Sequence, residues 1–239
     1  MPLPTIATPT YELELPSTGK KIKYRPFLVK EEKLLVLALE TENTKDISTA
    51  IKTVLKNCIQ SRGVKVENLP TFDIEYLFLN IRGKSVGEDV DVNLIAPDDE
   101  VTEVPVTINI DDIKIQKDEK HNKMIKLDDA LVMEMKYPSL DQFIKSNFDF
   151  KEENSMDQSF DLIASCIDKI YNEEEVWSTA DCTKKEVKEF LEQMNSMQFK
   201  EIETFFETMP KLSHKVTFTN PKTKVESTVV LEGLSSFFA

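Results

Sequence analysis

The spacing of apolar residues switches repeatedly between a strand period and a helix period along this chain, and this pattern constrains the fold more than any other feature. Apolar residues recur at helical spacing from about residue 29 to 83, and then alternate with polar residues from 86 to 137. Helical spacing returns from 139 to 208, and alternation returns from 215 to 231. We therefore predict an α+β fold with a helical bundle core, N- and C-terminal β-hairpins and a central antiparallel β-unit.

The N-terminal part is predicted to hold one hairpin and three helices. Two alternating stretches flank the turn residues Pro16-Ser17-Thr18-Gly19 and predict the hairpin. A leucine-rich helix should cover Val29 to Glu40 and should be largely buried. The next helix, from Ile47 to Ile59, has a continuous apolar stripe. The third helix should begin at Pro70 and end at Gly83.

Alternating strands around Val90, Val104 and Leu131 predict a single antiparallel meander. Capping-box patterns at Ser139 and Thr183 predict two helix starts, and a further helix is expected from Asn154 to Tyr171. A last helix should run from 196 to 208, before a closing hairpin around Asn220-Pro221-Lys222. We predict three segments: residues 1–85, hairpin plus helices; 86–137, an insert-like β-unit; and 138–239, a helical region with a closing hairpin.

The charge balance bounds the partners of the chain. The 239 residues include 43 acidic and 30 basic side chains, a formal charge of −13. A surface of this sign repels phosphate backbones and anionic lipid headgroups. The longest apolar run is far below the roughly 20 residues that span a bilayer. We therefore expect a soluble protein that binds neither nucleic acid nor membrane. Three widely spaced cysteines without a Cys-x-x-Cys pair favour a reducing cytosol.

Two short motifs resemble ligand-binding loops but lack an essential residue. Gly83-Lys84-Ser85 resembles the end of a phosphate-binding loop, yet Phe78 stands where that loop needs its first glycine. Asp89-x-Asp91-x-Asn93 copies the start of a calcium-binding loop, yet Leu94 occupies the position that needs a glycine. A plain turn and a solvated strand face are the simpler interpretations.

No residue pattern points to catalysis or to a bound cofactor. His121 and His214 are the only histidines, and neither has a cysteine or second histidine at ligand spacing. No Gly-x-Ser-x-Gly elbow is present, and the chain has 5 glycines. We therefore predict no catalytic, cofactor-binding or metal-binding residues, no cofactor, and a protein that is not an enzyme.

The aromatic pairs near the C-terminus suit packing and docking. Phe205-Phe206 is expected in the core, because apolar residues recur there at helical spacing. The ending can be anchored in its own fold or offered to a partner's groove. We take Leu234, Phe237 and Phe238 as candidate partner-binding residues.

Several stretches together resemble a known family. They span nearly the whole chain, least so from Leu94 to Lys123, and comprise Leu15-Pro16-Ser17-Thr18-Gly19-Lys20, Tyr24-Arg25-Pro26-Phe27-Leu28-Val29, Arg82-x-Lys84-Ser85-Val86-Gly87-Glu88, Met135-Lys136-Tyr137-Pro138, Phe205-Phe206-Glu207-Thr208-Met209-Pro210-Lys211-Leu212 and Leu231-Glu232-Gly233-Leu234. In their order they are similar to the baseplate hub-assembly and hub-subunit proteins of T-even-like contractile-tailed bacteriophages.

The resemblance implies a non-enzymatic role in building the baseplate hub, with hub and tape-measure proteins as partners. It implies the host cytoplasm during assembly as the location, or the tail baseplate of the virion if the chain is a retained hub subunit. The family brings no catalytic residues, and the oligomeric state is not predicted. Two further hypotheses stay open: a host-side adaptor, and a nucleotide-dependent enzyme resting only on Gly83-Lys84-Ser85 and scattered carboxylates.

Overall fold

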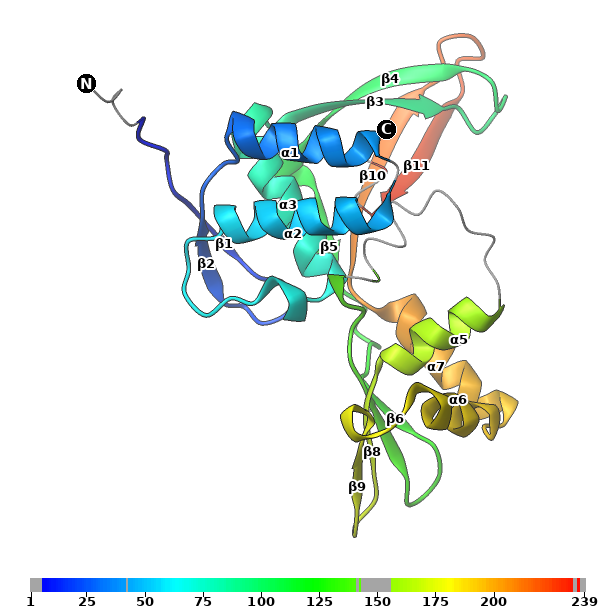
Figure 1. Cartoon of the computed structure of the whole chain (residues 1–239). Coiled ribbons are helices and arrows are strands. Elements are labelled where there is room, and N and C mark those ends of the chain that lie inside the picture. The colour runs from blue at the N-terminus through cyan, green and yellow to red at the C-terminus, as the bar shows by residue number, and fades with distance from the viewer. Residues whose placement is uncertain (1–5, 42, 141, 143–155, 234–235, 237–239) are drawn as a thin grey trace, which may run out of the picture.

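The computed structural model describes residues 6–41, 43–140, 142, 156–233 and 236. Figure 1 shows an upper lobe of helices and hairpins, and a lower lobe in which further helices lie beside a small sheet. The helices within the described residues are α1 (Val29–Glu40), α2 (Thr44–Cys58), α3 (Thr71–Val86), α5 (Met156–Ser165), α6 (Lys184–Glu192) and α7 (Ser196–Thr208), with short 3-10 turns η1 (Val66–Asn68), η2 (Ile110–Asp112) and η3 (Thr179–Asp181).

The strands in the described part of the chain form four small antiparallel sheets. They are β1 (Tyr11–Glu14), β2 (Lys21–Tyr24), β3 (Asp89–Ile95), β4 (Glu103–Asn109), β5 (Lys114–Gln116), β6 (Met124–Lys126), β7 (Val132–Met135), β8 (Ile167–Tyr171), β9 (Val176–Ser178), β10 (Lys211–Thr219) and β11 (Glu226–Glu232). The sheet orders are β1-β2, β3-β4, β11-β10-β5 and β6-β7-β8-β9. The α+β class and the hairpins near both ends are thus confirmed.

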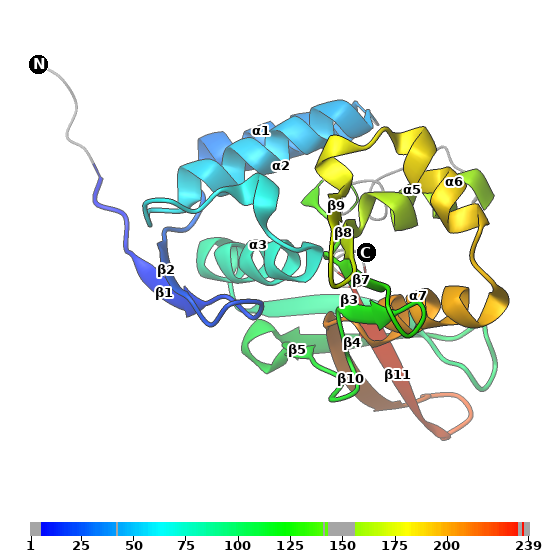
Figure 2. The same cartoon turned by 90° about the horizontal axis from the view of Figure 1, so that it is seen from below.

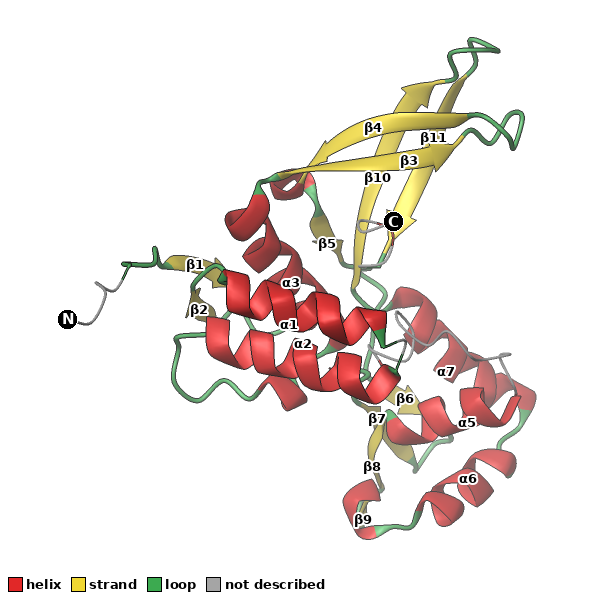
Figure 3. Ribbon diagram, turned by 45° about the horizontal axis from the view of Figure 1, so that its top comes forward, coloured by secondary structure: helices red, strands yellow, loops and turns green. Residues whose placement is uncertain are grey.

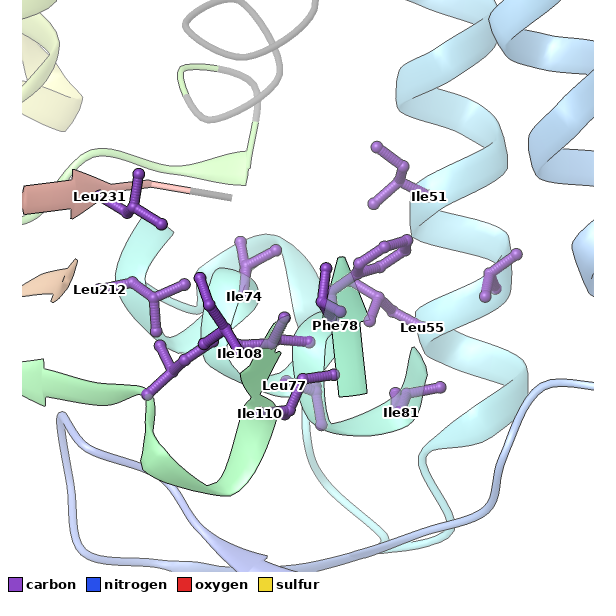
Figure 4. Packing of buried hydrophobic residues seen from close by; sticks show 14 of the residues in the cluster. Ile51, Leu55, Ile74, Leu77, Phe78, Ile81, Ile108, Ile110, Leu212 and Leu231 are labelled. Atoms are coloured by element: carbon purple, nitrogen blue, oxygen red, sulfur yellow. The ribbon is translucent and has the colours of Figure 1, made fainter. Parts of the chain in front are cut away.

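The upper lobe is built around helices α2 and α3. The side chain of Asn43 caps α2 by accepting a hydrogen bond from the Lys45 N–H at 2.9 Å. The predicted apolar stripe of α2 is buried from Ile47 to Cys58. Figure 4 shows Ile51 and Leu55 of α2 near Phe78 of α3, together with Leu212 and Leu231 from the C-terminal hairpin. Leu13 and Ile22 of the N-terminal hairpin belong to the same cluster. The N-terminal hairpin and Leu231 of β11 therefore share one core.

The lower lobe has its own hydrophobic cluster. Met133 and Met135 of β7, Ile167 of β8, and Ile202 and Phe205 of α7 are fully or almost fully buried in it. The predicted capping box at Thr183 is present, since the Thr183 N–H donates to the Glu186 carboxylate at 2.7 Å. Figures 2 and 3 show α5, α6 and α7 around the β6-β7-β8-β9 sheet.

A short polar and aromatic contact joins the two lobes. The Thr71 N–H at the start of α3 donates to the Pro138 carbonyl at 3.1 Å. The ring of Phe72 meets that of Tyr137 edge-on, with centroids 5.0 Å apart. Tyr137 in turn stacks on His121 and Phe205. Phe72 is almost fully buried at this contact.

Two predicted helix ends are wrong. Helix α3 continues through Gly83 to Val86, because the missing side chain lets the helix approach Ile110; a Cβ at Gly83 would lie 3.1 Å from Ile110 Cδ1. The stop is Gly87, at φ 122°. Helix α5 ends at Ser165 rather than Tyr171, because the following residues pair with β7 and β9 as strand β8.

The predicted single meander from 86 to 137 is also wrong. Strands β3 and β4 pair only with each other among the described strands, and β5 pairs with β10. Strand β6 pairs with β7, and β7 pairs on its other edge with β8. Backbone hydrogen bonds to strands far along the chain replace the expected local ones. The three-segment domain division stays a prediction. The helix expected after Ser139 lies mostly outside the described residues, although the Ser139 N–H does donate to Gln142 Oε1 at 2.8 Å.

Candidate partner-binding surfaces

Helix α1 carries a set of exposed large apolar side chains. Val29 is 79% exposed, and Val36 and Leu37 are each 50% exposed. Leu28, Leu34 and Leu39 are also exposed, whereas Ala38 is buried against the lobe. The expectation that this helix is largely buried is therefore wrong. The apolar side chains of α1 point to all sides of the helix. Helix α2 packs against only one side of α1, so the apolar side chains on the other sides stay exposed (Figure 1).

A buried ion pair fixes the start of α1. Glu31 is 1% exposed, and its carboxylate accepts from Arg25 Nη2 at 3.0 Å and from the Leu28 N–H at 2.8 Å. Burial alone would raise the pKa of Glu31, but the bonds from Arg25 and Leu28 outweigh it and hold that pKa below its usual value. The same bond to Glu31 raises the pKa of Arg25. Helix α1 is thus rigidly attached while its outer face stays open.

A hollow of about 360 Å³ lies where the two lobes meet. Phe72, Phe206, Met209 and Pro210 give it mostly apolar walls, and Gly233 stands at its edge. The Gly233 N–H donates to the Leu212 carbonyl at 3.0 Å, which sets the point where the chain leaves β11. The predicted partner-binding residues Leu234, Phe237 and Phe238 follow directly and lie outside the described residues.

Polar side chains of the two ligand-like motifs, Gly83-Lys84-Ser85 and Asp89-x-Asp91-x-Asn93, form hydrogen bonds within the fold. Ser85 Oγ, within α3, accepts from the Phe27 N–H at 2.9 Å. Asp89 accepts from Asn109 Nδ2 at 2.9 Å and Asp91 accepts from Thr107 Oγ1 at 2.7 Å, both across the β3-β4 ladder. Within the described residues no group of three or more His, Cys, Asp or Glu side chains is arranged to hold a metal ion.

His121 is a structural residue at the junction of the lobes. Its ring nitrogens lie 3.0 Å from Thr208 Oγ1 and 3.0 Å from the Tyr137 hydroxyl. Burial, together with the charge of Lys123, lowers the pKa of His121. Phe205 is buried beside it, as predicted, with Phe206 packed against the same cluster.

Comparison with known protein families gives one match. The model of a family described as T4 bacteriophage base plate protein matches residues 8–239. The chain belongs to this family. No curated protein and no solved structure matched. As a T4-type baseplate family member, the chain has a structural or assembly role in a phage baseplate, where it contacts other baseplate proteins of the virion tail.

The part of this baseplate protein that sequence reasoning missed is the open face of α1. A signal was present, because the charged residues of α1 are gathered at 30–33 and at Glu40, and the six residues between them, Leu34 to Leu39, are all apolar and cover every side of the helix. Such a helix has no polar face to turn toward solvent. Among the described helices, none is long and apolar enough to cross a membrane.

Proposed function

We propose that this baseplate family member is a non-enzymatic hub-assembly protein that binds hub or tape-measure proteins in the host cytoplasm during tail morphogenesis. The observation that carries the proposal is the exposed apolar face of α1. Six large apolar side chains on or just before one helix stand open to solvent. Contiguous patches of this kind mark interaction sites when they exceed a few hundred Å².

The shape of the α1 surface favours a helical partner. A single exposed helix is a ridge, and the side-chain rows of a second helix pack onto such a ridge at 8–10 Å between axes. Lys30, Lys33, Glu32 and Glu40 on the exposed side give the surface both signs of charge. Tape-measure proteins are expected to be long and helical with apolar stripes, so they fit this surface.

The C-terminal residues supply a second proposed contact. Leu234, Phe237 and Phe238 follow Gly233 at the edge of the hollow between the lobes. Aromatic residues at such positions serve as anchors in protein interfaces. We assign these three residues to partner binding.

Co-purification tests the proposal. Full-length protein is co-expressed with the phage's hub and tape-measure proteins, and complexes are quantified by affinity capture. The double variant Val36→Gln/Leu37→Gln is expected to lose at least about tenfold in captured partner, because two exposed apolar anchors are removed. The matched control is Ile95→Gln, an exposed apolar residue in β3. Equal capture by both variants would contradict a role for α1.

A structural hub subunit is the alternative within the same family. Such a subunit would need larger and more permanent interfaces than a transient assembly factor. Quantitative mass spectrometry of purified virions and of infected-cell lysates separates the two. Abundance in the lysate with absence from the particle supports the assembly factor, whereas stoichiometric presence in the particle supports the hub subunit.

A further inference from the structure

The lower lobe contains an apolar groove that is separate from α1 and from the hollow at Gly233. The groove has a volume of about 340 Å³. Ile170 and Trp177 of the sheet line the groove together with Leu131, the residue before β7, and Val187 and Phe190 of α6 also line it. Thr179, Cys182 and Glu186 complete its edge. Its lining is almost wholly apolar.

The strand register places the tryptophan on the groove side of the sheet. Ile170 lies directly opposite Trp177 in the β8-β9 pair, so both side chains are on one face. Tyr171 and Val176, the next pair, are on the other face. Trp177 is nevertheless 41% exposed. A large aromatic side chain thus stands half covered at the mouth of a groove.

The groove is held in shape by fixed backbone contacts. Thr179 Oγ1 lies 2.7 Å from the Ile167 carbonyl and 2.9 Å from the Asp168 carbonyl, which attaches η3 to β8. The Thr183 capping box then sets the start of α6. Because both walls are anchored in this way, the groove does not need to form on binding.

The surroundings of the groove are acidic. The segment from 172 to 187 contains five acidic and two basic residues. Glu173, Glu174 and Glu175 are exposed in the turn before Val176, and Asp181 is exposed next to Cys182. Glu186 lines the groove, and bonds from Thr183 lower the pKa of its carboxyl group. A ligand for this site should therefore combine apolar groups with positive charge.

We propose that this groove binds an amphipathic helix of a partner protein, with apolar side chains inserted beside Trp177 and lysine or arginine side chains facing the acidic rim. The inference rests on the proposed function in one respect, since the natural helix is expected to belong to another phage tail protein. A helix with residues at i, i+3 and i+4 presents the row of apolar anchors that such a groove takes. Tryptophan is the residue type most enriched at the energetic centre of interfaces.

The chain carries two natural probes of this groove. Trp177 is the sole tryptophan of the sequence, so intrinsic tryptophan fluorescence reports on the groove alone. Cys182 is exposed, whereas Cys58 and Cys166 are buried, and burial raises the pKa of each of these two thiols to about 11. A maleimide should therefore modify Cys182 selectively.

Two synthetic 18-residue helices test the proposal on the full chain. One has leucine on one face and lysine on the other, and its counterpart has glutamate in place of lysine. At about 0.15 M salt, where attraction between exposed charges more than about 8 Å apart is largely screened, the lysine peptide should shift Trp177 emission to shorter wavelength and slow maleimide modification of Cys182. The glutamate peptide should do neither.

Variants locate the binding. Trp177→Ser should weaken binding of the fluorescently labelled lysine peptide by about thirtyfold, the effect of losing one interface hot spot. Val176→Ser, at a 66% exposed residue on the opposite face of the same strand, should change it less than about twofold. Wild-type protein alkylated at Cys182 should also lose binding, which keeps the test valid if Trp177→Ser fails to fold.

Three outcomes would overturn the proposal. The first is equal binding of the two peptides, and the second is peptide binding that survives both Trp177→Ser and alkylation of Cys182. The third is binding of the neutral dye Nile red in the groove without displacement by the lysine peptide, which would indicate a small-ligand site. The proposed function can fail separately. If the lysine peptide binds but no hub or tape-measure protein is captured, the proposed partners are refuted and the proposed peptide-binding groove is retained. If hub or tape-measure proteins are captured equally well by the Trp177→Ser variant, the proposed function is retained and a role for the groove in it is refuted.

Discussion

Glu31 is the residue whose burial depends most directly on a single partner. Its carboxylate is enclosed and accepts a hydrogen bond from Arg25 at 3.0 Å. Arg25→Ala removes the guanidinium that pairs with this buried charge, which is expected to lower the free energy of unfolding by about 3–5 kcal/mol. Urea titration followed by circular dichroism measures the change.

The control for this prediction is Lys30→Ala. Lys30 also lies near Glu31, at 3.5 Å, but its side chain is mostly exposed. The expected change in unfolding free energy is within about 0.5 kcal/mol. The double variant Arg25→Met/Glu31→Leu should recover much of the lost stability. A loss below about 1 kcal/mol for Arg25→Ala would show that Glu31 does not depend on the pair.

Asp73 gives the chain a pH dependence of known sign. It is fully buried, and burial raises the pKa of its carboxyl group above the ordinary 3.8 despite a bond from the Ser17 N–H at 3.0 Å. The folded state therefore holds this proton to higher pH than the unfolded state does. Between the two pKa values, stability contributed by Asp73 falls as pH rises.

Asp73→Asn should remove this dependence. As pH rises from below 4, the unfolding free energy of the wild type is expected to fall relative to that of the variant. This relative decrease should level off above the pKa of Asp73 in the folded state. Urea titrations at a series of pH values measure it. A difference that is flat with pH, or that shifts in the opposite direction, would show that the folded-state pKa of Asp73 is not raised.

At the scale of elements, the side-chain amide of Asn220 connects the turn of the β10-β11 hairpin to the turn of the β3-β4 hairpin. Asn220 between β10 and β11 is fully buried, and its Nδ2 lies 3.1 Å from carboxylate oxygens of Asp98 and Asp99 between β3 and β4. Thr223 Oγ1 also donates to Asp98. These bonds couple hairpins that are more than 100 residues apart in the chain.

Asn220→Ala should uncouple the two hairpins. The expected loss is about 1–3 kcal/mol of unfolding free energy, because the hydrogen bonds of the buried Asn220 amide to two carboxylates are lost. Hydrogen exchange should accelerate in both turns, 96–102 and 220–225, and not in α2. Lys222→Ala, an exposed neighbour, serves as the control. Faster exchange confined to 220–225 would contradict the coupling.

Elements with strong local signals were predictable from the sequence, and elements that depend on distant partners were not. The apolar stripe from Ile47 to Cys58 and the capping box at Thr183 act within a few residues, so α2 and α6 were expected. The sequence predicts helix where β8 forms, because Ile163, Ile167 and Ile170 fit helical spacing, whereas pairing with β7 and β9 imposes the strand. The open face of α1 and the groove at Trp177 depend on what packs nearby, which spacing along the chain does not show.

At the scale of the whole molecule, Phe72 connects two hydrophobic clusters. It is almost fully buried and meets Tyr137 of the lower lobe edge-on. Phe72→Ala should lower the free energy of unfolding by about 3–5 kcal/mol. It should also split a single calorimetric transition into two, as the lobes begin to melt separately. Phe78→Ala, within the upper cluster, should lower stability without such splitting. A single calorimetric transition in Phe72→Ala would show that the two lobes are coupled by contacts other than those of Phe72.

The pairing of β10 with β5, and the burial of Leu231 among residues of the N-terminal helices, have a consequence for synthesis on the ribosome. Translation delivers about 5–20 residues per second, so the first helices are made many seconds before the strands that complete their core. During that interval the nascent chain keeps much of its apolar surface uncovered. Its folding therefore finishes only after β10 and β11 have been made, and until then this apolar surface is open to contact with other chains.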